Sequence, residues 1–133
     1  MTTPTRSVEQ TAAWDAQPIT PSRARSVVAD ALGRAGYDEI AADITATALL
    51  LTSELVTNAV VHAPGPVKIR VRCDDHLLRV EVHDRSTVAP RRLEVVEGSI
   101  GGRGMQVMDA LATDWGNRLA PGGKIVWFDL ALG

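Results

Sequence analysis

Three polar side chains recur at four-residue spacing in an otherwise apolar segment: Glu54, Asn58 and His62. In a helix this spacing places them in one line along one face. Carboxylate and amide oxygens one turn apart suit Mg²⁺, which takes hard oxygen ligands and often shares phosphate oxygens. The carboxylate could instead deprotonate an attacking hydroxyl or water. A polar stripe that meets solvent or a loop would look the same, so this pair alone leaves both interpretations open.

The three histidines indicate no metal site. His62 falls at the expected end of its helix, where an imidazolium interacts favourably with the helix dipole, and this end-capping role is favoured over a contact with phosphate. His76 adjoins a turn and His83 lies on the polar side of a strand. Their spacing matches no metal-binding pattern such as H-E-x-x-H, so His76 and His83 are assigned no role.

Two further features could bind a ligand together with that helix. Asp84 shares its parity with the apolar Leu78, Val80 and Val82, which predicts a carboxylate on the core-facing side of a strand end. Further on, Gly101-Gly102-Arg103-Gly104 forms a glycine loop before a helical pattern that starts at Met105. Backbone amides of such a loop and a helix N-terminus can bind an anion, although the same glycines can serve a plain turn.

The elements that must position these residues follow from hydrophobic periodicity and from breaker residues. Thr20-Pro21 predicts a helix start, with Thr20 as the cap, and Pro64-Gly65-Pro66 ends the next helix. The expected order is a weak edge strand over 7–14, helices over 20–36 and 39–62, a hairpin over 67–84, a glycine loop with the Met105 helix, and strands over 113–119 and 124–130. This order predicts an α/β fold, with helices on one face of a mixed, mostly antiparallel sheet.

Composition narrows the class of protein. The 133 residues are 45% hydrophobic, which predicts one domain over 1–133, with 1–6 as a flexible tail. The net charge of −2 and the scattered arginines give no basic footprint for nucleic acid. The single Cys73 excludes an internal disulfide. No signal peptide is evident, and no apolar run is expected to approach membrane-spanning length, so we expect a cytoplasmic protein without a membrane partner.

Four segments resemble one family. Residues 51–63 (LTSELVTNAVVHA) resemble the N box of Bergerat-fold (GHKL) ATPases, especially the anti-sigma-factor serine kinases of actinobacteria and bacilli. Residues 82–86 (VHDRS) look like a reduced first glycine box, and residues 102–108 (GRGMQVM) look like the second. Trp115-Gly116 with residues 122–127 (GGKIVW) is similar to the characteristic end. The resemblance covers roughly residues 20–130.

The resemblance implies a two-layer α/β sandwich that binds ATP and Mg²⁺. Asn58 would coordinate the Mg²⁺ on the ATP phosphates, Glu54 would be the general base for an accepting serine hydroxyl, and Asp84 would bind the adenine amino group. The residues bordering the triphosphate would be Gly102, Arg103 and Gly104, with 85–100 as a mobile lid. The leading hypothesis is therefore an anti-sigma factor that holds a sigma factor inactive and phosphorylates an anti-sigma antagonist on serine. The resemblance also implies a homodimer, which is common in the family.

Two departures from the family pattern limit this hypothesis. The first glycine box of the wider family is Asp-x-Gly-x-Gly, whereas Ser86 stands at the first glycine position and the second glycine is absent. Ile125 stands where Thr is frequent, which predicts a missing hydroxyl near Asp84. Both departures predict weakened nucleotide binding.

Three rival functions stay open. The first is a catalytically inactive module, with or without nucleotide, that sequesters a partner protein. The second is the detached ATPase half of a sensor histidine kinase, which is disfavoured because no dimerisation helix with a phosphoacceptor His precedes Thr20. The third is a metal hydrolase built on the three histidines, which their spacing disfavours.

Overall fold

The computed structural model describes residues 7–37, 42–63, 65–86 and 100–132, and for 100–105 it describes the backbone only. The elements are, in chain order, β1 (Val8–Trp14), α1 (Thr20–Arg34), α2 (Ala42–His62), β2 (Val67–Cys73), β3 (Leu77–Asp84), α3 (Ile100–Leu111), β4 (Asp114–Ala120) and β5 (Gly123–Ala131). The expected tail over 1–6, residues 87–99 of the proposed lid over 85–100, and the start of the second helix at 39 lie outside the described residues.

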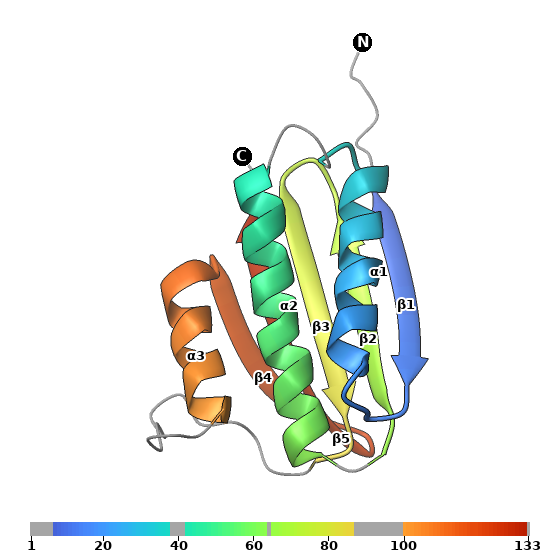
Figure 1. The fold of residues 1–133 in the computed structure, drawn as a ribbon. Coiled ribbons are helices and arrows are strands. Elements are labelled where there is room, and N and C mark those ends of the chain that lie inside the picture. Colours follow the sequence, from blue (N-terminus) through green and yellow to red (C-terminus); the bar gives the residue numbers. More distant parts are fainter. Residues whose placement is uncertain (1–6, 38–41, 64, 87–99, 133) are drawn as a thin grey trace.

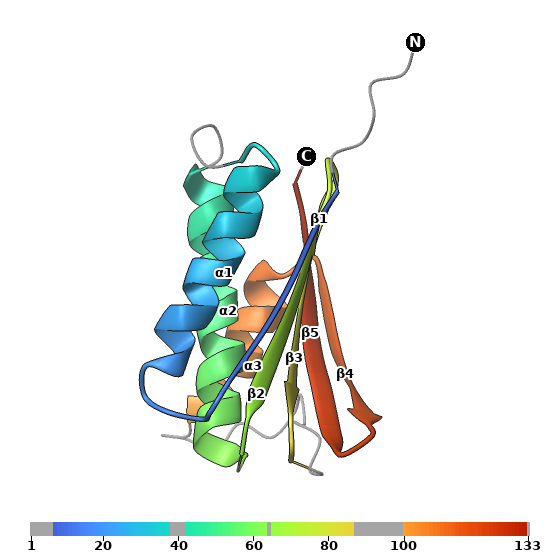
Figure 2. The same ribbon diagram turned by 90° about the vertical axis from the view of Figure 1, so that its right-hand side faces the viewer.

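The five strands form one sheet in the order β1-β2-β3-β5-β4. Every neighbouring pair among them is antiparallel, so the expected mixed sheet is, over the described strands, wholly antiparallel. The three helices cover one face of this sheet, as Figures 1 and 2 show. The α/β two-layer architecture is therefore confirmed, and β1 is an edge strand as expected.

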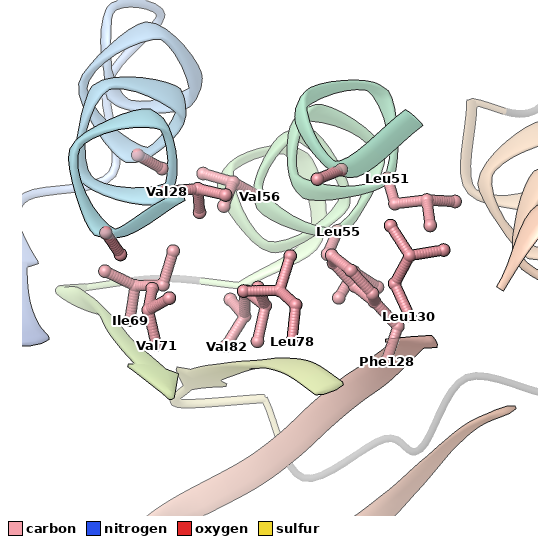
Figure 3. Close-up of a cluster of buried hydrophobic side chains, with 14 of the residues drawn as sticks. Val28, Leu51, Leu55, Val56, Ile69, Val71, Leu78, Val82, Phe128 and Leu130 are labelled. Atoms are coloured by element: carbon pink, nitrogen blue, oxygen red, sulfur yellow. The ribbon is translucent and has the colours of Figure 1, made fainter. Parts of the chain in front are cut away.

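The core lies between the helix layer and the sheet (Figure 3). Strand β2 alternates strictly between buried and exposed residues, because successive side chains of a strand point to opposite faces. Its buried side meets helices α1 and α2, and the largest fully buried side chain of the core is Phe128 on β5. We call the opposite side of the sheet the outer face; it carries Glu9, Lys68, Arg70, Arg72, Arg79, Glu81, His83, Arg118, Ile125, Trp127 and Asp129.

Two local predictions about helices were wrong. Thr20 is the first residue of α1 and not its cap, since its hydroxyl accepts from the Gln17 N–H and donates to the Asp15 carbonyl in the preceding turn. The segment 101–104 is not a loop, because α3 already begins at Ile100. Glycine disfavours a helix by about 1 kcal/mol per residue relative to alanine, but packing of the apolar side of α3, with Met108 fully buried, favours the helix.

Helix α2 contradicts one expectation drawn from composition. By length and hydropathy alone it could cross a membrane, although no apolar run was expected to approach that length. The apolar residues serve the core instead, since Leu51, Leu55 and Val56 are buried in the layer shown in Figure 3. A long core helix passes the same compositional test as a membrane span.

Candidate functional site

Four motif-bearing segments meet at one end of the molecule. The C-terminal half of α2, the last residue of β3, the first turn of α3 and the turn between β4 and β5 all lie at the lower end in Figure 1. The sheet register explains part of this arrangement, because Asp84 at the end of β3 pairs with Lys124 at the start of β5. We call this region the Asp84 end.

The three polar side chains of the row on α2 differ in their solvent exposure. Asn58 is 8% exposed, Glu54 is half-buried and His62 is exposed in the last turn. The Asn58 side chain hydrogen-bonds to none of the described residues. Among the described residues no fully buried side-chain nitrogen or oxygen lacks a partner, so the Asn58 amide is reached by solvent and is open to a ligand at this position.

Asp84 is a buried carboxylate, only 3% exposed, on the helix-covered face of the sheet. The Ser86 N–H donates to its Oδ1 at 2.8 Å, and the Lys124 Nζ lies 3.9 Å from its Oδ2. Burial raises the pKa of Asp84 above its usual value, although the Ser86 N–H and the Lys124 ammonium both act in the opposite direction. The predicted inward orientation of this carboxylate is confirmed.

The cross-strand neighbour of Asp84 corrects the expectation about Ile125. Residues directly opposite each other in an antiparallel pair point to the same face, and Ile125 pairs with His83 on the outer face. A hydroxyl at position 125 would therefore lie on the other side of the sheet from Asp84. The residue beside Asp84 is Lys124, whose side chain is buried and forms the ion pair.

Sequence reasoning missed Lys124. It has the same parity as Val126, Phe128 and Leu130, all of which are buried, so the alternation placed it on the core side. The alternation does not reveal the strand register, and it is the register that places Lys124 opposite Asp84.

The two glycines before Lys124 let the strands approach closely. Gly122 has a φ of +78°, in the left-handed region that favours glycine. A Cβ on Gly123 would lie 1.8 Å from the Asp84 carbonyl oxygen, so only glycine fits there without moving β3 or β5. The two glycines therefore allow the β3 and β5 backbones to approach closely at Asp84 and Lys124.

Gly102, Arg103 and Gly104 lie in the first turn of α3, at the Asp84 end. The first N–H groups of a helix have no partner within the helix and favour anions. The predicted anion-binding site was a glycine loop followed by a helix. In the structure the glycines lie within the start of the helix itself. Contacts between these residues and a phosphate stay a prediction.

The donor set fits a magnesium nucleotide better than a histidine-bound metal. Asn58 and Glu54 offer an amide and a carboxylate one turn apart, and Mg²⁺ takes such oxygen ligands while retaining water. Over the part of the chain that the structure describes, no three His, Cys, Asp or Glu residues gather into a metal-binding group. His76 lies in the β2–β3 turn, and His83 lies on the outer face.

Comparison with known families agrees with this geometry. The sequence model of the histidine kinase-like ATPase domain family matches residues 15–130, which is most of the chain. The chain therefore belongs to the histidine kinase-like (GHKL) ATPase family, and its α/β layers are those of the Bergerat fold. A search of curated proteins found no match. Membership in this family implies an ATP-binding domain.

Proposed function

We propose that this chain is an anti-sigma factor with ATP-dependent serine kinase activity, which holds a sigma factor inactive and phosphorylates a protein antagonist. The observation that carries the proposal is the polar row on α2. A buried amide without a hydrogen bond to the described residues stands one turn from a half-buried carboxylate, at the end of the molecule where Asp84 is buried. The proposed setting is cytoplasmic, with protein partners, no membrane or direct nucleic-acid partner, and a homodimer as the assembly.

In this proposal each group at the Asp84 end has a separate task. The Asp84 carboxylate accepts a hydrogen bond from the adenine amino group. The Asn58 oxygen holds Mg²⁺, which when bound offsets the charge of the ATP phosphates. The backbone of Gly102, Arg103 and Gly104 borders the triphosphate.

The proposed chemical step uses Glu54 as the general base. The oxygen of the accepting serine forms a bond to the γ-phosphorus, and the bond from that phosphorus to the β,γ-bridging oxygen breaks. The serine proton passes to the Glu54 carboxylate, and ADP leaves. The half-buried position of Glu54 fits this task, because the group stays open to an incoming side chain.

The decisive measurement is transfer of labelled phosphate from Mg·ATP to a serine of a candidate antagonist by the purified chain. Glu54→Gln removes the base but keeps the shape of the side chain, so we expect nucleotide affinity to persist while transfer falls about 100-fold or more. Asp43→Asn is the matched control, since it removes one carboxylate from the first turn of the same helix. Full transfer by Glu54→Gln would exclude the base role.

A second function has one observation in its favour. The Lys124 ammonium is buried beside Asp84 and pairs with the carboxylate that the adenine would need. This pairing favours a partner-sequestering module with weak nucleotide binding or none. Calorimetry with Mg·ATP separates the two functions, because a chain that sequesters its partner without nucleotide would show no saturable heat.

A further inference from the structure

A pocket lies on the outer face at the Asp84 end. Its volume is about 370 Å³, and proline residues 66 and 121 form part of its wall. Lys68 and His83, which line it, are a cross-strand pair of β2 and β3. Their neighbours Val67 and Val82 are buried under the helices, so Lys68 and His83 point away from α2. The pocket is therefore on the opposite side of the sheet from Asn58.

Three basic side chains line this pocket: Lys68, His83 and Arg85. The side chain of Arg85 packs on the turn before β2, where a Cβ added to Gly65 would lie 3.0 Å from the Arg85 Cδ. This contact holds the guanidinium stem near the strand ends. The pocket thus brings basic groups from β2, from β3 and from the residue after β3 into one small volume.

These basic groups differ from most of those elsewhere on the outer face. Arg70 and Arg118 contact Glu81, and Arg79 forms a bidentate pair with Asp129. By contrast, Lys68, His83 and Arg85 form no ion pair with any residue that the structure describes.

The acidic side chain among the residues that line the pocket lies on the opposite face of the sheet from the basic ones. Asp84 also lines it, but its carboxylate is on the helix-covered face, where it accepts from Ser86 and pairs with Lys124. The outer face of the pocket therefore carries two formal positive charges, from Lys68 and Arg85, with the His83 imidazole beside them.

We propose that this outer-face pocket binds a phosphate monoester. A dianionic phosphoryl group matches two or three cations better than a single carboxylate does, and both guanidinium and ammonium groups bind phosphate oxygens. The pocket volume falls in the range of small-ligand sites. The phosphoryl group could belong to a phosphorylated protein side chain or to a small metabolite, which share this chemistry. Lys68 and His83 have no role in the proposed kinase activity, whereas Arg85 is the first residue of the proposed lid, so Lys68→Ala is the variant that tests this pocket alone.

The test is a titration of the purified chain with inorganic phosphate, followed by backbone amide NMR. We expect saturable shifts at the amides of residues 68, 83 and 85. Lys68→Ala and Arg85→Ala should each weaken binding about tenfold, since each removes a charge-assisted contact. Arg72→Ala is the matched control, because it removes an exposed cation from the outer face of β2 outside this pocket. The affinity of Arg72→Ala for phosphate should equal that of the wild type.

Two further measurements identify the source of the phosphoryl group and the site at which it binds. A phosphoserine peptide that binds more tightly than inorganic phosphate would indicate a protein partner, and equal affinities would indicate a small phosphate compound. Asn58→Ala should leave these shifts unchanged, which distinguishes the pocket from the nucleotide site. The proposal is overturned if no saturable shift is seen at these amides, or if Arg72→Ala weakens binding as much as Lys68→Ala does.

Discussion

At the scale of single residues, the Asp84 end combines two buried polar groups with different electrostatics. Asn58 is neutral and hydrogen-bonds to none of the described residues, whereas Asp84 is ionisable and already accepts a backbone N–H. Glu54 lies one turn before Asn58 and is open to solvent on one side. These differences allow substitutions to separate metal binding, adenine binding and proton transfer.

Asn58→Ala should weaken Mg·ATP binding at least about tenfold, since the amide oxygen is the proposed magnesium ligand. The free energy of unfolding should change by less than about 1 kcal/mol, because no hydrogen bond to a described residue is lost. Calorimetry measures the first quantity and urea denaturation the second. Thr57→Ala, a neighbouring half-buried position, is the control and should bind normally. Unchanged affinity in Asn58→Ala would remove Asn58 from the site.

Asp84→Asn tests the electrostatics of the buried carboxylate. Burial raises the pKa of Asp84 in the folded protein, so the folded state binds this proton more tightly than the unfolded state does. The contribution of Asp84 to stability should therefore fall as pH rises from 3.8 through the raised folded pKa. Urea denaturation of the wild type and of Asp84→Asn across this window measures it. A difference in unfolding free energy that stays flat or grows with pH would contradict the assignment.

At the scale of elements, the site depends on how closely two strand ends approach. The turn between β4 and β5 places Gly123 against the backbone of Asp84, and the register then sets Lys124 opposite the carboxylate. Helix α2 contributes Asn58 and Glu54 to the site, and α3 begins at the same end of the molecule (Figure 1). The site therefore joins the ends of several elements and does not lie within any one of them.

Gly123→Ala should lower the free energy of unfolding by about 3 kcal/mol, at the upper end of the usual cost of overpacking. The reason is the 1.8 Å approach of the added Cβ to the Asp84 carbonyl oxygen. Gly122→Ala is the matched control: its Cβ meets open space, and only the positive φ is unfavourable, at about 1 kcal/mol. Thermal or urea denaturation compares the two variants. Equal losses would show that the close approach is not the cause.

At the scale of the whole molecule, the two faces of the sheet are stabilised differently. One face is covered by helices and packed with apolar side chains, as Figures 2 and 3 show. The outer face instead carries ion pairs between strands: Arg79 of β3 pairs with Asp129 of the neighbouring β5, and Arg118 of β4 reaches across β5 to Glu81 of β3. The Arg79 guanidinium also stacks 4.5 Å from the centre of the Trp127 ring. Glu81 and Asp129 are buried on this face by their neighbours.

Asp129→Asn should destabilise the protein by about 2–3 kcal/mol, because it removes a bidentate, charge-assisted pair and leaves a partly buried guanidinium unbalanced. Glu9→Gln breaks the contact of Glu9 with Arg70, whose side chains are about half exposed, and should cost no more than about 1 kcal/mol. Urea denaturation at low and moderate salt compares them. A similar small loss in both variants would show that burial adds little to the Asp129 pair.

The local pattern of this protein could be predicted from its sequence. Strict alternation predicted the β2–β3 hairpin and the inward direction of Asp84, and four-residue spacing placed Glu54 and Asn58 on one helix face. These patterns succeed because side-chain direction in a strand or helix is fixed by local backbone geometry. The motifs also predicted the family, which the comparison confirmed.

The tertiary structure alone shows which of these local patterns meet. It inserted β5 between β3 and β4, set Lys124 beside Asp84, and moved Ile125 to the other face. It also extended α3 through the glycines that local propensity assigns to a loop, and it created the outer-face pocket from separate strands. The physical reason is that strand order and register are selected by burial and packing between segments far apart in the chain, which no local spacing records.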